Sequence, residues 1–101
     1  MLISTNATHF FPEGFHAGRK VIMEICGSSF GGGTATPGFK AADGEFSPFI
    51  REDGSPIGLT SRGGFEVRVP RSGILGINLT GATEPALILD IIAAVDMTPG
   101  S

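Results

Sequence analysis

The clearest pattern of hydrophobic and polar positions lies between Gly63 and Thr80. Two runs place large apolar residues at every second position, namely Phe65, Val67 and Val69, then Leu75, Ile77 and Leu79. A period of two buries one face of a strand and leaves the other in water. The residues between the runs, Pro70 to Gly73, are typical of a turn. This stretch therefore predicts an antiparallel hairpin and, with it, a small all-β domain.

Turn signals continue along the rest of the chain at intervals of ~8–12 residues, the spacing typical of a sandwich or barrel. Other strands are expected at 2–11 (a first strand or arm), 20–26, 34–36 (stopped by Pro37-Gly38) and 56–60. We predict one antiparallel β-sandwich or barrel, Greek-key or jelly-roll-like, with about seven or eight short strands. It spans residues 1–101, with an N-terminal arm at 1–12 and a short C-terminal tail at 96–101.

The segment 86–95 fits two structures. As a strand, it has two apolar faces and would be central in a sheet or covered by a partner. As a helix, it has an apolar stripe, with Thr83 as the cap and Pro85 in the first turn. The all-β context and the β-branched residues favour the strand.

Composition and charge narrow the classes of function. Charged residues make up 17% of the chain, against about 25% in an average protein, so the surface is rich in Gly, Ser and Thr loops or partly hidden by neighbours. A net charge of -3 with scattered basic residues argues against nucleic-acid binding. Cys26 is the single cysteine, so no disulfide can form within the chain. We recognise no signal peptide, and the longest apolar run, 91–95, is far shorter than the ~20 residues of a membrane span.

Candidate reactive motifs are weak. The glycine-rich segment 27–33 follows a strand, but no Lys or Arg follows it as in a phosphate-binding loop, so we expect a flexible or contact loop. His9 and His16 could face each other across a turn that contains Glu13, but a metal site needs three or four ligands of fixed geometry. Neither histidine has the context of a catalytic triad. We therefore expect no enzyme activity, no cofactor and no metal.

Acidic residues in the turns leave one alternative open. Asp43 with Glu45, and Glu52 with Asp53, flank two Asp-Gly turns. Such carboxylates are usually solvated and bind backbone N–H groups. A loose calcium site is conceivable there, although the chain lacks the ordered oxygen ligands of an EF-hand.

The aromatic residues suggest protein contacts. The chain has eight Phe and neither Trp nor Tyr, so its rings carry no polar group for binding sugars. A small sandwich cannot easily bury every ring, and contiguous exposed rings mark protein interfaces. The residues that we predict to form an interface, led by the pair beside Pro12, are Phe10, Phe11, Phe15, Phe30, Phe39 and Phe49.

The second half of the chain, DGSPIGLTSRGGFEVRVPRSGILGINLTGATEPALILDI, resembles small β-sandwich proteins of tailed-bacteriophage particles. The similarity lies in short sequence motifs such as Gly-Gly-Phe-Glu-Val-Arg-Val-Pro, Ser-Gly-Ile-Leu and Leu-Thr-Gly-Ala-Thr. It implies a virion protein assembled in the host cytoplasm, foremost a head decoration (cement) protein that binds the major capsid protein or other virion proteins. A tail, connector or fibre component is the alternative. Such a protein would also form homo-oligomers, with a trimer favoured, because self-association buries apolar surface. The resemblance carries over no functional residues.

A carbohydrate- or receptor-binding module is the main rival from another class. Sugar-binding faces prefer Trp and Tyr, which this chain lacks. A sugar site would need Asn, Asp and Arg converging on one aromatic ring in a cleft, whereas decoration needs a flat apolar patch.

Overall fold

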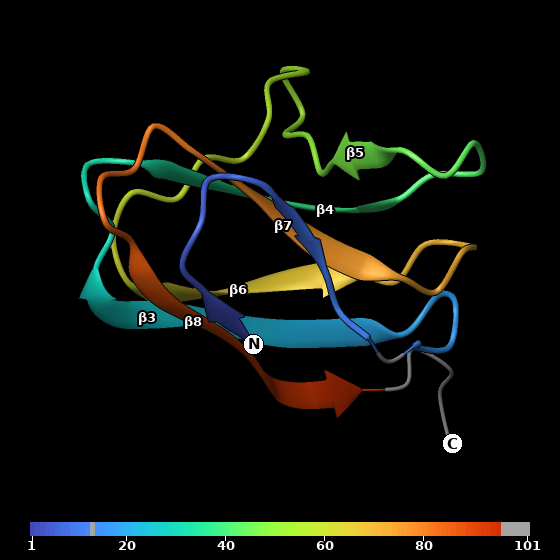
Figure 1. The fold of residues 1–101 in the computed structure, drawn as a ribbon. Helices are drawn as coiled ribbons and strands as arrows, with labels where there is room; N and C mark the ends of the chain where they lie inside the picture. Colours follow the sequence, from blue (N-terminus) through green and yellow to red (C-terminus); the bar gives the residue numbers. More distant parts are fainter. Residues whose placement is uncertain (13, 96–101) are drawn as a thin grey trace.

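Two four-stranded antiparallel sheets face each other in the computed structural model, which describes residues 1–12 and 14–95 (Figure 1). Sheet A has the strand order β1 (Leu2–Ile3), β8 (Ala86–Val95), β3 (Lys20–Ser29) and β6 (Gly63–Arg68). Sheet B has the strand order β2 (Thr8–Phe10), β7 (Leu75–Thr80), β4 (Thr34–Lys40) and β5 (Phe46–Pro48). The predicted all-β sandwich is confirmed. The tail predicted at 96–101 lies outside the described residues.

The core lies between the sheets and is built from the alternating apolar positions. The fully buried side chains, at 0–1% exposure, include Val21, Met23 and Ile25 of β3, Leu75, Ile77 and Leu79 of β7, and Leu87 and Leu89 of β8. Burying one such side chain contributes about 1.5–3 kcal/mol. No polar or charged residue is buried in the described part of the chain, so the side chains between the sheets contact each other through apolar packing.

The segment 86–95 forms β8, which confirms the strand over the helix. It pairs with β1 on one side and with β3 on the other. Leu87 and Leu89 point into the core, whereas Ile88 and Ile92 are exposed on the outside. The register with β3 shifts between Ile22 and Met23, which inserts an extra β8 residue as a bulge.

The hairpin predicted between 63 and 80 is wrong, because its two strands belong to different sheets. β6 pairs with β3 in sheet A, and β7 pairs with β2 and β4 in sheet B. The turn itself is present: the Gly73 N–H donates to the Pro70 carbonyl over 3.0 Å, and Gly73 has a φ of 73°. Alternation of apolar and polar residues shows which face of a strand is buried, but not which strand it pairs with. Two strands in opposite sheets of a sandwich have the same alternation as two strands paired in a hairpin.

Two further boundaries differ from the sequence prediction. β4 continues through Pro37, which was expected to stop it. The Pro37 carbonyl accepts the Phe49 N–H over 3.0 Å, so it points away from β7. The nitrogen of a strand residue points to the same side as its carbonyl. The missing N–H of Pro37 therefore costs no hydrogen bond to β7. The strand expected at 56–60 is reduced to the isolated bridges Ile50–Pro56 and Ala35–Leu59.

The N-terminal segment 1–12 contributes to both layers. β1 pairs with β8 in sheet A, and β2 pairs with β7 in sheet B. Between them, the Asn6 amide donates to the Ala82 carbonyl over 2.7 Å and accepts the Ala82 N–H over 2.9 Å. The first residues are therefore held to the sandwich along their length.

Candidate functional site

Of the six phenylalanines predicted to form an interface, Phe11 belongs to the core, and all the others except Phe10 pack against it. Phe11 lies in the core at 6% exposure, and Phe15 meets it edge-on with ring centroids 6.2 Å apart. Phe39 and Phe49 form a second pair at 5.2 Å, and Phe30 packs separately against the core.

Phe10 belongs to a third group, with Phe46 at 6.2 Å and the Lys40 ammonium 5.7 Å from its ring centroid. The six predicted rings are thus divided among separate contacts and do not form one patch. No phenylalanine is among the large exposed hydrophobic residues of the described chain. Their role in binding stays a prediction.

The glycine-rich segment 27–33 is closely packed. Gly27 and Ser29 belong to β3. The Gly31 carbonyl accepts the Thr83 N–H over 2.9 Å, and a Cβ on Gly31 would lie 2.2 Å from the Thr83 carbonyl oxygen. Gly27, Gly31 and Gly33 let the backbone approach neighbouring segments closely, so these three glycines have a structural role that needs no ligand.

The histidines and carboxylates form no metal site in the part of the chain that the structure describes. There, no three His, Cys, Asp or Glu side chains gather around a common point. The ring of His9 interacts with the Thr5 carbonyl over 3.0 Å. Glu13, the third residue of the predicted His9–His16 group, lies outside the described residues.

The turn carboxylates bind their own backbone. Asp43 accepts the Glu45 N–H over 3.0 Å. Asp53 accepts both the Ser55 N–H, over 2.9 Å, and the Ser55 hydroxyl, over 2.6 Å. These two hydrogen bonds lower the pKa of Asp53 below its ordinary value, and the bond from the Ser55 hydroxyl has the larger effect. The carboxylates therefore act as turn acceptors.

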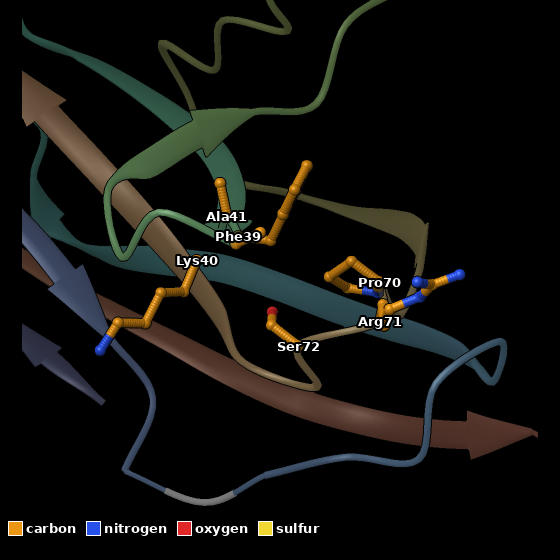
Figure 2. A pocket seen from close by; sticks show the side chains of 7 residues that line it. Phe39, Lys40, Ala41, Pro70, Arg71 and Ser72 are labelled. Carbon is orange, nitrogen blue, oxygen red and sulfur yellow. The ribbon is translucent and has the colours of Figure 1, made fainter.

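One hollow of about 300 Å³ lies between the end of β4 and the turn before β7 (Figure 2). Its walls are formed by Phe39, Lys40, Ala41, Ala42, Pro70, Arg71 and Ser72. The charged ends of Lys40 and Arg71 point away from each other in Figure 2. No acid, histidine or cysteine lines the hollow, so it holds no group that could activate Ser72 as a nucleophile.

The outer face of sheet A is where exposed aliphatic side chains gather. Leu2 and Ile88 are register partners on β1 and β8, and Ile88 is also the partner of the half-buried Cys26 on β3. Leu2 is 71% exposed and Ile88 44% exposed. We call these three residues the aliphatic row. Further along the same face, Ile92 is 55% exposed and Ile22 is half-buried.

Charged rows lie between and beside these apolar residues. Glu24 of β3 and Asp90 of β8 are register partners next to the aliphatic row. Lys20 and Arg68 are partners at the other end of the face. Lys20 also forms an ion pair with Glu66, with Nζ and Oε2 3.3 Å apart. Along β3 and β8 the outer face therefore alternates apolar, acidic, apolar and basic positions, and the exposed Glu66 of β6 lies beside Ile22.

The edge of β8 beside β1 is only partly covered. The Met1 ammonium donates to the Leu89 carbonyl over 2.6 Å, and the Leu89 N–H donates to the Met1 carbonyl over 2.8 Å. Beyond that point, the Ile91 N–H donates to the Asp90 carboxylate over 3.1 Å. The Asp90 side chain thus occupies an N–H that a further strand would need for pairing at this edge.

The sequence contained one signal for this face. Both faces of 86–95 are apolar, which indicated either a central strand or a strand covered by a partner. The place of Leu2 on this face could not be predicted from the sequence, because Leu2 pairs with Ile88, which lies near the other end of the chain.

Comparison with known proteins finds no matching family model, no matching curated protein and no matching solved structure. The described residues include no helix long and apolar enough to cross a membrane.

Proposed function

We propose that this chain is a non-enzymatic structural protein of a virus particle, and that it acts as a capsid decoration protein that stabilises a phage head. The partner is the major capsid protein or another protein of the particle. The proposal joins the resemblance of residues 53–91 to small phage structural proteins with one feature of the fold, the exposed aliphatic row on the outer face of sheet A.

That row supports a protein contact because of its position. Leu2, Ile88 and Cys26 lie side by side across three strands of one sheet, where pairing holds their backbones in place. A row of apolar side chains on a rigid sheet gives a flat contact surface, and burial of exposed apolar area is a main driving force of protein association. The hollow near Phe39 offers no comparable set of converging polar groups for a small ligand.

Decoration also gives the surface a physical purpose. A protein that binds the assembled shell and not its dissociated subunits stabilises the shell by mass action. It needs many weak, identical contacts and no reactive group. The low charge content of 17% fits a surface of which part is covered in the particle.

Quantitative mass spectrometry of purified particles from the source lysate tests this proposal. We expect hundreds of copies of the chain per particle, as a lattice-wide role requires. A few to some tens of copies would instead indicate a tail, connector or fibre component. Complete absence from the particles would overturn the proposal and favour a separate carbohydrate- or receptor-binding module.

A further inference from the structure

We infer that β6 pairs edge to edge with β6 of a second copy of this chain, antiparallel and with a two-fold axis at Val67, so that Glu66 of each copy lies opposite Arg68 of the other. This pairing goes beyond the proposed function, since it concerns contacts between copies of the chain. It would join two A sheets into one continuous sheet. The aliphatic row, which lies on β1, β8 and β3, would stay exposed.

The edge formed by β6 is the longest edge strand in the described part of the chain. β1, β2 and β5, which form the other edges, have two or three residues each, whereas β6 has six. Its pairing with β3 runs from Gly63 to Arg68 without a register shift, and the strand contains no proline. Proteins protect exposed edges with short strands, bulges and prolines, and β6 has none of these. The end of β8 beyond β1 is also uncovered, but there Asp90 accepts the Ile91 N–H.

Every second residue of β6 turns its backbone N–H and carbonyl away from β3. Val69, directly after the strand, donates its N–H to the Arg19 carbonyl over 2.8 Å. By alternation, Val67 also bonds to β3, whereas Glu66 and Arg68 turn to the free edge. No other described segment forms a backbone hydrogen bond with either of them. A further strand would therefore find unpaired donors and acceptors here.

The two charged residues of β6 make the strand complementary to its own reversed copy. With the axis at Val67, each Glu66 faces Arg68 of the second copy and exchanges a pair of backbone hydrogen bonds with it. Opposite charges in facing positions stabilise a sheet, and like charges destabilise it. An axis at Glu66 would set two carboxylates against each other, and an axis at Phe65 would set Glu66 opposite the uncharged Gly64. The charges therefore favour the axis at Val67.

A single copy leaves Arg68 for the second copy to neutralise. Arg68 is the register partner of Lys20, so two cations lie opposite each other, and no ion pair joins Arg68 to an acid among the described residues. Lys20 lies 3.3 Å from Oε2 of Glu66, and a carboxylate has a second oxygen that accepts hydrogen bonds. Each Glu66 would then lie between Lys20 of its own chain and Arg68 of the second copy.

The inner face fits the same register, and the length of the edge sets the strength of the contact. Phe65 is half-buried and Val69 is 3% exposed, and with the axis at Val67 these two apolar residues face each other between copies. Six residues of strand are only about 20 Å long, so the contact buries less than the ~1,200 Å² of a standard interface. Main-chain hydrogen bonds supply the affinity when a strand is added to a sheet edge. We therefore expect a weak, reversible dimer.

Two charge reversals test the register. Glu66→Arg sets cations opposite cations, and Arg68→Glu sets acids opposite acids. Each variant alone should dimerise at least about tenfold more weakly than the unmodified chain in analytical ultracentrifugation. An equimolar mixture restores the opposite-charge contacts, and we expect a heterodimer, which an unfolded variant would not form. Glu84→Arg makes the same change of charge at an exposed residue between β7 and β8, and this control should associate like the unmodified chain.

Hydrogen exchange separates edge pairing from any other contact between copies. As the dimer forms with rising concentration, the amides of Glu66 and Arg68 should become protected, whereas the amide of Val67, already bonded to β3, should change far less. The inference is overturned if the unmodified chain stays monomeric up to ~1 mM, forms a trimer, or forms a dimer that leaves these two amides unprotected or that neither charge reversal weakens. None of these results bears on the copy number in particles, so failure here and failure of the proposed function are distinguishable.

Discussion

Glu24 and Asp90 are register partners on the outer face of sheet A, which places two carboxylates opposite each other on adjacent strands. No ion pair joins either of them to a cation in the described part of the chain. Asp90 has a second role, because its Oδ1 accepts the Ile91 N–H at the edge of the sheet. The monomer therefore retains an unfavourable charge pair in its longest pair of strands.

Asp90→Asn should stabilise the monomer. Asparagine keeps an oxygen for the Ile91 N–H and removes one of the two like charges, and we expect the free energy of unfolding to rise by about 0.2–1 kcal/mol. Urea denaturation at low protein concentration and low salt measures the change. Glu52→Gln removes a carboxylate from an exposed loop and should leave stability unchanged. Equal effects of the two substitutions would contradict repulsion between Glu24 and Asp90.

Gly27→Ala should weaken the contact between β3 and β8. Gly27 has a φ of 141°, and a Cβ there would lie 2.2 Å from the Ala86 carbonyl oxygen. We expect a loss of about 2 kcal/mol or more in the free energy of unfolding, since both the backbone strain and the clash must be relieved. Gly32→Ala is the matched control, because Gly32 has a φ of 75° and open space around it. Its cost should be about 1–2 kcal/mol, and thermal or urea unfolding that ranked Gly32→Ala as the more harmful would contradict the packing described for Gly27.

Asn6→Ala should loosen the N-terminal segment. The substitution removes the two hydrogen bonds that join Asn6 to the backbone of Ala82, and we expect a loss of about 1–3 kcal/mol. Hydrogen exchange at the Ala82 amide should become faster than exchange at the core of β7. Asn78→Ala removes a single exposed bond with Thr8 and should cost about 0.5 kcal/mol or less. An unchanged Ala82 exchange rate in Asn6→Ala would show that the segment is held in another way.

The loop around Asp53 should lose order in acid. Hydrogen bonds from the hydroxyl and the N–H of Ser55 lower the pKa of Asp53. The stability that these hydrogen bonds give to the turn is therefore fully present above the ordinary pKa of an aspartate. It is lost as the pH falls through the lowered pKa of Asp53. The Ser55 amide resonance should follow this titration in NMR spectra, whereas Asp53→Asn should keep the turn and abolish the titration. A Ser55 amide that titrates equally in Asp53→Asn would assign the effect to another group.

Much of the fold could be predicted because its strands bury one face each. The alternation of Val67 with Glu66 and Arg68, and of Ile77 with Asn78, identified β6 and β7. Alternation does not show which strands pair with each other. For this reason β6 and β7 were predicted to form one hairpin, although they lie in opposite sheets.

The candidate site was less accessible from the sequence. Ile88 could be assigned to a second apolar face of 86–95, but its neighbours Leu2 and Cys26 are brought beside it only by pairing between distant parts of the chain. The phenylalanines stood next to glycines and prolines, which suggested exposed loops. In the structure, the ends of the sandwich give such rings space to pack, as Phe11 does at 6% exposure.

Binding of purified variants to particles that lack the chain tests most directly the claim that the protein works through the outer face of sheet A. Ile88 and Ile50 are exposed by 44% and 61%, but only Ile88 lies on that face, so Ile88→Ser and Ile50→Ser form a matched pair. We predict that Ile88→Ser, with its fold verified by thermal unfolding, binds at least about tenfold more weakly than the unmodified chain, and that Ile50→Ser binds normally. Equal binding of Ile88→Ser and the unmodified chain would contradict the account.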